Sequence, residues 1–250
     1  MKKILVALLV LIPFATHAGR VNTYKALAVE GWQVFIDEDL IASNPKIEGA
    51  GLKNLKESLE KIDKILPKEF TSFSKGNGVK IFISPSRKVF GRTGMFFIPK
   101  GNYGFETGLE RIMNNAIVIV DKSVFMKPDL LLYYLIHELA HYYHFSVLGY
   151  MNKDIWNSYH RAKVMPTYGK ASFNLSNHLE FFAESTAMFF TMREELVKID
   201  KGAVPLMKKL WGTQLAQYNQ ISKDIEAVDT ADEITRARER KARSLFPRAK

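Results

Sequence analysis

The residues best suited to chemistry are two histidines and a glutamate in the run HELAHYYH, residues 137–144. His137 and His141 are four residues apart, so on an α-helix their imidazoles leave one face and can bind a single ion. Glu138 projects toward the edge of that face, where it can take a proton from a metal-bound water without being a ligand. The spacing therefore predicts a zinc site that activates water, with Glu138 as general base.

The surrounding residues favour a helix. Pro128 and Asp129 are typical of a helix start, the apolar residues 130–136 supply buried surface, and Gly149 favours a helix end. The alternative is that the motif arose by chance on an ordinary core helix. A third protein ligand would favour the catalytic interpretation, because catalytic zinc sites use three protein ligands and leave the fourth position to water.

The third ligand is expected downstream. A metzincin motif requires Gly at position 144 and His at 147, but the chain has His144 and Val147, so that class is excluded. Residues 177–190 instead place Glu180 and Glu184 one turn apart on a phenylalanine-rich helix. Zinc is a suitable partner for a buried Glu180, and Glu184 could accept the free N–H of a zinc-bound imidazole. The alternative is an amphipathic helix with two solvated glutamates.

These motifs resemble those of gluzincin metallopeptidases of the type found in the catalytic C-terminal domain of anthrax lethal factor and its small secreted bacterial relatives. The resemblance rests on HELAHxxH followed by N-x-x-E-F-F-A-E. It extends to Gly31-Trp32, to VLGY at 147–150 and to KKLWG at 208–212, and so covers most of residues 24–212. It implies a zincin-like α+β fold, in which a small sheet packs on the HExxH helix above a helical lower part.

The resemblance also implies roles for individual residues. His137, His141 and Glu180 would bind Zn²⁺, Glu138 would be the general base, and Glu184 would be the carboxylate behind a ligand. The implied activity is hydrolysis of a peptide or protein substrate.

Other residues near the motifs are assigned less directly. Seven residues before the ligand glutamate, the family commonly has a tyrosine that steadies the tetrahedral intermediate, but this chain has Phe173. Tyr168 could take over that role or be an ordinary turn tyrosine. His144 shares the metal face one turn on and could contact substrate, or be a hydrogen-bonded helix histidine. His160 lacks the spacing of a ligand, and His178 is expected to be a cap or surface residue.

Three segments are predicted: a signal peptide over residues 1–18, a metallopeptidase domain over 19–226 and a basic tail over 227–250. Lys2 and Lys3 precede an apolar stretch that ends at the cleavage signal Thr16-His17-Ala18, so export to the periplasm or medium is expected. No later apolar run is long enough to span a bilayer, so the processed chain is not expected to be integral to the membrane. The absence of cysteine excludes disulfides.

The net charge is +10, and removal of Lys2 and Lys3 with the signal peptide would leave +8. A basic surface favours an acidic partner, with the tail as the candidate contact. The densest basic run, residues 236–243, alternates with an acid, so a solvated basic helix is the alternative. No nucleic-acid motif is present, and specific nucleic-acid binding is not expected.

Periodicity predicts the remaining elements. Residues 116–122 are predicted to be a buried or edge strand beside the cleft, where an extended peptide could pair with an exposed edge. The other predictions are strands at 33–36 and 78–85, a helix over 52–65 ended by Pro67, loops over 86–110, a helix from the ligand glutamates to about Lys198, and a helix from Pro205 toward Ile225.

The leading hypothesis is an exported zinc metallopeptidase. A different class, a zinc-stabilised module that binds a peptide or wall component without cutting it, is favoured by Phe173. A third hypothesis is an exported domain without metal. Digestion of unfolded protein, with and without a chelator, separates the first two.

Overall fold

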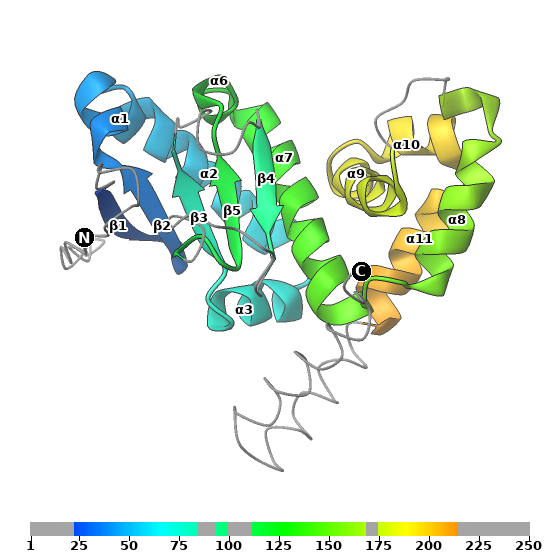
Figure 1. Ribbon diagram of the computed structural model, residues 1–250. Coiled ribbons are helices and arrows are strands. Elements are labelled where there is room, and N and C mark those ends of the chain that lie inside the picture. Colours follow the sequence, from blue (N-terminus) through cyan, green and yellow to red (C-terminus); the bar gives the residue numbers. More distant parts are fainter. Residues whose placement is uncertain (1–22, 85–93, 100–111, 169–174, 215–250) are drawn as a thin grey trace, which may run out of the picture.

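The computed structural model describes residues 23–84, 94–99, 112–168 and 175–214. The predicted signal peptide, the basic tail, Phe173 and most of residues 86–110 lie outside these ranges. The described chain has an α+β architecture with one five-stranded sheet, as expected. Helix α7 lies between the sheet and a second group of helices, α8 to α11 (Figure 1).

The first two strands form a hairpin. β1 (Tyr24–Val29) and β2 (Trp32–Asp37) pair antiparallel, and Glu30 and Gly31 between them both have positive φ, 50° and 80°. Positive φ at both turn residues is typical of the tight hairpin turn that matches strand twist. β2 confirms the strand predicted at 33–36, whereas β1 was not predicted.

The strand order is β1-β2-β3-β5-β4. β3 (Lys80–Ile83) and β5 (Ala116–Ile119) confirm two predicted strands; β2, β3 and β5 are mutually parallel. β5 is flanked on its second side by the antiparallel β4 (Met95–Ile98), so the edge beside α7 belongs to β4 and not to β5. The prediction of loops over 86–110 is therefore wrong at β4. Residues 95–98 lie within a Gly- and Pro-rich segment that favours loops, and pairing with β5 makes them a strand.

The helices of the first half cover one face of the sheet. α2 (Leu52–Ile65) confirms the predicted helix and ends at Leu66, whose backbone is extended (φ −82°, ψ 153°) before Pro67. That conformation is the one favoured by a residue that precedes proline. The other short elements are α1 (Glu38–Ser43), η1 (Ile47–Gly51), α3 (Lys68–Gly76) and α6 (Lys122–Phe125).

The motif helix has the predicted boundaries. α7 (Pro128–Tyr143) begins with proline in its first turn and continues as a π-helical segment, η2 (His144–Leu148). Gly149 follows with φ 80°, a value that glycine adopts without strain, and the helix ends there. Tyr142 and Tyr143 near the end of the helix are buried.

The second half is helical. The helix predicted to run to Lys198 is interrupted at Met192 (φ −141°, ψ 52°), although no glycine or proline marks the break. The helix expected from Pro205 begins at Ala203 and passes into a π-helical segment; residues beyond 214 are outside the described ranges. The elements are α8 (Lys153–Lys163), η3 (Pro166–Tyr168), α9 (His178–Thr191), α10 (Arg193–Asp200), α11 (Ala203–Lys208) and η5 (Lys209–Gln214).

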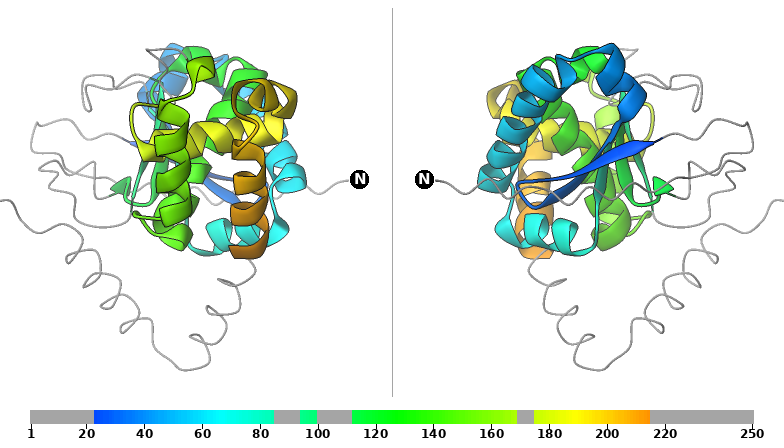
Figure 2. Two further views of the ribbon diagram at one scale, coloured as in Figure 1. Left: turned by 90° about the vertical axis from the view of Figure 1, so that its right-hand side faces the viewer. Right: turned by 90° about the vertical axis from the view of Figure 1, so that its left-hand side faces the viewer.

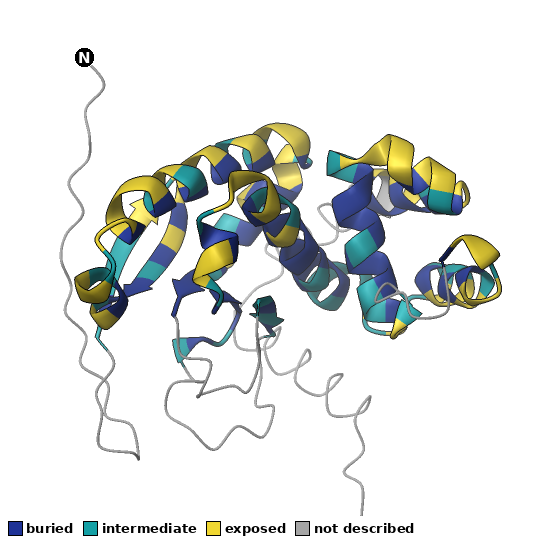
Figure 3. Cartoon of the chain, turned by 90° about the horizontal axis from the view of Figure 1, so that it is seen from above, coloured by how far each residue is buried: buried dark blue, intermediate teal, exposed yellow. Residues whose placement is uncertain are grey.

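α9 is the central helix of this half. In the left-hand view of Figure 2, α8 and α11 stand in front of α9, and both pack against it. Burial is concentrated in the sheet and in the facing sides of the central helices, while the outer helical faces are exposed (Figure 3). Among the described residues, no helix is both long and apolar enough to cross a membrane.

The two halves share one aromatic cluster. The ring centroid of Trp211 lies 4.2 Å from that of Tyr143 and 5.0 Å from that of Phe70, and the Tyr143 hydroxyl donates to the Leu210 carbonyl at 2.6 Å. Trp211 also donates through its indole N–H to the Thr186 hydroxyl at 3.2 Å. Burial of these large rings packs η5, which carries Trp211, against α3 and α7, and the hydrogen bond to Thr186 ties it to α9.

Candidate metal centre

Polar side chains run along the interface between α7 and α9. Tyr133 faces Glu184, His137 faces both Glu184 and Glu180, and His141 faces Glu180. Residue numbers rise along one helix as they fall along the other, so the two helices are antiparallel. The i, i+4 spacing on each helix puts every one of these groups on the shared face.

α7 places its motif residues by burying the rest of the helix. Leu135, Ile136 and Leu139 are at most 1 % exposed and anchor the helix in the core. His137 is also buried (4 %), and His141 is partly buried on the side facing α9. The orientation of the two imidazoles is therefore set by the packing of the helix that carries them.

Asn177 is the N-cap residue of α9. Its side-chain oxygen accepts hydrogen bonds from the backbone N–H groups of Leu179 (2.9 Å) and Glu180 (3.0 Å). This N-cap fixes the first turn of the helix and with it the backbone from which the Glu180 side chain extends. Asn177 was not assigned a role from the sequence, although Asn followed by Glu three residues later is a helix-start signal.

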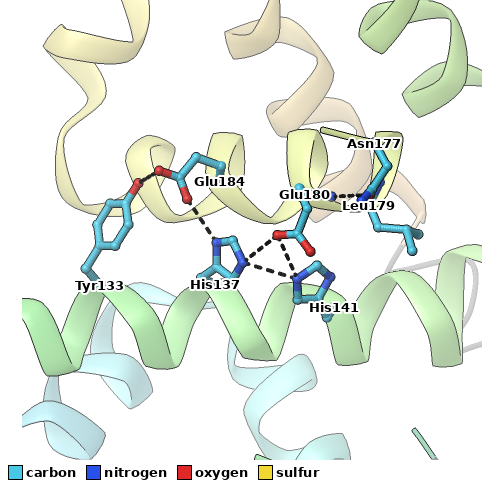
Figure 4. A network of polar contacts seen from close by, with 7 residues as sticks. All are labelled: Tyr133, His137, His141, Asn177, Leu179, Glu180 and Glu184. Atoms are coloured by element: carbon cyan, nitrogen blue, oxygen red, sulfur yellow. Dashed lines mark hydrogen bonds and ion pairs between the residues drawn. The ribbon is translucent and has the colours of Figure 1, made fainter. Parts of the chain in front are cut away.

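The three predicted ligand atoms lie together (Figure 4). His137 Nε2 is 3.1 Å from Glu180 Oε2 and 3.1 Å from His141 Nε2. His141 Nε2 is 3.4 Å from Glu180 Oε2. A tetrahedral zinc ion with bonds of about 2.0–2.1 Å holds neighbouring ligand atoms about 3.3 Å apart, so this spacing fits one such ion. Within the described ranges, it is the only group of three or more His, Cys, Asp and Glu side chains that converges in this way.

The electrostatics of the cluster call for a cation. Burial disfavours charge on His137, but hydrogen bonds to Glu180 and Glu184 outweigh it and raise its pKa to about 10. Burial likewise disfavours the Glu180 carboxylate, yet hydrogen bonds from His137 and His141 hold the pKa of that carboxyl well below its usual range. Either a proton or a metal ion can supply the positive charge that the two carboxylates require.

Glu184 lies behind the ligand His137. Its Oε2 is 3.0 Å from His137 Nδ1, the nitrogen that points away from the cluster, and its Oε1 accepts a hydrogen bond of 2.6 Å from the Tyr133 hydroxyl. A carboxylate in this place favours the tautomer with the proton on Nδ1, which leaves Nε2 free to bind a metal. The structure thus places Glu184 where the sequence predicted it, and it adds Tyr133.

Glu138 is separate from the ligand cluster and lies toward the sheet. Its side chain is buried (4 % exposed), and burial raises its pKa despite the nearby imidazoles of His141 and His137 and a hydrogen bond from the Phe97 backbone. Phe97 belongs to the edge strand β4. A buried carboxylate with a raised pKa beside a metal-binding cluster is suited to accept a proton and to return it.

Two residues predicted near the cluster are engaged elsewhere. The Tyr168 hydroxyl donates to Asp200 Oδ2 at 3.1 Å, in a network with Arg161 and not with the three ligands. His144 is 1 % exposed, and its ring packs against those of His178 and Phe182.

The remaining two histidines of the described ranges do not join the cluster. His178 is buried, not a surface residue, and the cap of its helix is its neighbour Asn177; its Nε2 lies 3.1 Å from the Tyr150 carbonyl oxygen. His160 is exposed and packs on the Trp156 ring. Among the described residues, the cluster therefore contains two histidines, His137 and His141.

No protein-family model matches the chain, and no curated protein matches it. Function is therefore inferred from the geometry of the cluster.

Proposed function

We propose that this protein is an exported zinc metallopeptidase with a zincin-like fold, similar to the gluzincins. The observation that carries the proposal is the convergence of His137, His141 and Glu180, at ligand spacing, beside the buried Glu138. Two imidazoles and one carboxylate are a donor set typical of catalytic zinc. A signal peptide over residues 1–18 would direct the chain out of the cytoplasm.

The chain's own groups would divide the reaction between them. A bound zinc ion would polarise the scissile carbonyl and lower the pKa of a water in the site. Glu138 would accept the proton of that water as it attacks and would hand it to the leaving amine, which requires a carboxylate with a raised pKa. Glu184 would keep the His137 ring in position.

The edge strand is suited to align the substrate. β4 pairs with β5 on one side only, and among the described strands none pairs with its other side. Val120 donates to the Gly94 carbonyl beside β4, so by antiparallel alternation the backbone groups of Phe97 point away from β5. An extended peptide that adds to this edge would bring its backbone close to Glu138.

The test is Glu138→Gln, which keeps the shape of the side chain and removes the base. We expect zinc content to stay unchanged and cleavage of an unfolded protein to fall by roughly 10²–10⁴-fold. Asp129→Asn, a neutralising change on the exposed first turn of the same helix, is the matched control and should keep activity. Cleavage by Glu138→Gln at the wild-type rate would show that the assignment is wrong.

A second candidate function is a zinc-stabilised peptide-binding module without efficient catalysis. It is favoured by Phe173, which cannot donate to a developing oxyanion, and by the engagement of the Tyr168 hydroxyl with Asp200. Absence of one oxyanion donor typically costs ~10²–10³-fold in turnover. If the protein is a slow peptidase, Phe173→Tyr should therefore raise its turnover by roughly tenfold or more. A wild-type protein that retains zinc and binds peptide but never cleaves it would favour the binding module.

A further inference from the structure

Tyr133 occupies a defined place in the polar network and has no role in the mechanism above. It lies on α7 one turn before His137, with its ring partly buried, and its hydroxyl donates to Glu184 Oε1 at 2.6 Å (Figure 4). The other oxygen of the same carboxylate, Oε2, is 3.0 Å from His137 Nδ1. The order of contacts is therefore hydroxyl, carboxylate, imidazole, then ligand atom.

The two oxygens of Glu184 have different partners, and this determines how the carboxylate is held. A carboxylate bonded through one oxygen can rotate about its last side-chain bond, because the torsion before an sp² group is broad. A donor on each oxygen fixes the plane of the group. His137 approaches from one turn of α7 and Tyr133 from the turn before it, so both donors are held by one helix.

The geometry points to Tyr133 as a positioning residue for the metal centre: by holding Glu184 Oε1, it keeps Glu184 Oε2 on His137 Nδ1 and thereby presents His137 Nε2 to the metal. This inference rests on the proposed function, because it needs His137 to be a ligand. Tyr133 acts through Glu184 and contacts none of the three ligand atoms in the described structure. Burial and the neighbouring Glu184 carboxylate raise the pKa of Tyr133, so its hydroxyl stays protonated and remains a donor.

The competing explanation is that the hydroxyl only joins two helices. A structural bond of that kind would change the stability of the fold and leave the chemistry of the metal centre unaltered. Tyr134 provides a matched control, since it is the next residue on the same helix, is 37 % exposed and lies with its ring centroid 5.8 Å from that of Tyr133. Tyr134→Phe removes the same atom without touching Glu184.

The experiment uses the full chain loaded with Zn²⁺, and in parallel with Co²⁺, as wild type, Tyr133→Phe, Tyr134→Phe and Glu184→Ala. The readouts are the rate of metal transfer to an excess of chelator, the visible absorption of the cobalt form, and the urea unfolding of the metal-free proteins. Glu184→Ala should lose metal roughly 10–100-fold faster than wild type. Tyr133→Phe should lose it roughly three- to tenfold faster, with a shifted cobalt spectrum and little change in metal-free unfolding, and Tyr134→Phe should match wild type.

A double variant distinguishes action through Glu184 from a separate effect. In the Glu184→Ala background, adding Tyr133→Phe should change neither the metal-loss rate nor the cobalt spectrum further, because the hydroxyl has no carboxylate left to hold. If Tyr133→Phe alone behaves like Tyr134→Phe while Glu184→Ala loses metal quickly, the role of Tyr133 is overturned and the proposed function stands. If the wild type retains neither Zn²⁺ nor Co²⁺, both are overturned.

Discussion

Two carboxylates in the helical half, Asp200 and Glu180, differ in the source of their positive partner. Asp200 is fully buried and receives a two-pronged ion pair from Arg161, at 2.7 Å and 2.8 Å. The Tyr168 hydroxyl and the backbone N–H groups of Gly202 and Ala203 complete its hydrogen bonds. Every lone pair of Asp200 thus has a donor that belongs to the chain.

Glu180 lacks such a permanent partner. Its Oε2 lies 3.1 Å from His137 Nε2 and 3.4 Å from His141 Nε2, atoms that carry positive charge only when a proton or a metal ion is bound. An arginine is always charged and makes a structural pair, whereas imidazoles leave the cation exchangeable. The Asp200 network is therefore complete without a ligand, whereas the donor atoms around Glu180 leave a place for an exchangeable cation.

The largest expected effect is on zinc retention, which should depend on the Glu180 cluster and not on the Asp200 network. Glu180→Ala removes a proposed ligand and should weaken zinc retention by more than roughly 100-fold. The reason is that removal of a residue that only holds a ligand in place already costs roughly 10–100-fold. Asp200→Asn should leave zinc retention at the wild-type level. Equilibrium competition with a graded chelator measures both, and equal losses in the two variants would contradict the distinction.

The next effect concerns stability. Asp200→Asn leaves Arg161 without its anion, and removing one member of a buried pair typically costs 3–5 kcal/mol. Because the Arg161 side chain is 40 % exposed and can be rehydrated, we expect a loss of about 2–4 kcal/mol in the free energy of unfolding. Urea unfolding of the metal-free protein measures it. A loss below about 0.5 kcal/mol, the size of an ordinary surface substitution, would show that the network is dispensable.

His144 differs from His137 in how its protonation affects stability. It is the first residue of η2, directly after α7, and is buried like His137, but it faces His178 and not a carboxylate. Burial, with the neighbouring His178 and His141, lowers its pKa to about 3. The ordinary pKa of histidine is near 6.5, so the folded state favours neutral His144. The stability that this preference contributes is present above pH 6.5 and is lost as pH falls toward 3. Between pH 7 and pH 4.5, the free energy of unfolding of His144→Leu should therefore rise by about 2 kcal/mol relative to that of the wild type. Urea unfolding of both metal-free proteins at these pH values tests this, and a pH-independent difference would contradict it.

The smallest expected effect tests the tight fit of the Arg161 pair. A Cβ added at Gly202 would lie 2.7 Å from Arg161 Nη1, too close for the guanidinium to stay in place. We expect Gly202→Ala to lower the free energy of unfolding by about 1–2 kcal/mol, the usual cost of overpacking. Gly76→Ala, where nothing lies within 4 Å, is the matched control and should be neutral or slightly stabilising. Thermal unfolding of both variants measures this, and an equal change of melting temperature in the two would exclude crowding at Arg161.

Local sequence signals were sufficient for several elements. Pro128 and Gly149 bound the motif helix as predicted, and the apolar period over residues 52–65 gave α2 its observed limits. β4 was missed because it lies within a Gly- and Pro-rich segment that favours loops, and its pairing with β5 is what makes it a strand. The break at Met192 carries no glycine or proline signal, so it too required the packing of the second half.

The roles of the tyrosines required contacts between distant segments. Tyr133 is four residues before His137, a spacing that signals a shared helix face, but only the approach of Glu184 gives its hydroxyl a partner. Tyr168 was considered for the catalytic site. Its neighbours in sequence do not reveal that its hydroxyl donates a hydrogen bond to Asp200.

By itself, the sequence determined that His137 and His141 share one face of α7 and that Glu138 projects toward its edge, because the 3.6-residue turn fixes their relation wherever the helix lies. It also predicted Glu180 as the third member of the group, which the structure brings together. Only the tertiary structure decided what each histidine meets. The antiparallel packing of α9 places carboxylates opposite His137 and a histidine opposite His144, so two buried imidazoles on one helix acquire pKa values displaced in opposite directions, about 10 and about 3. Burial and neighbouring charge set a pKa, and both depend on contacts between segments far apart in the chain.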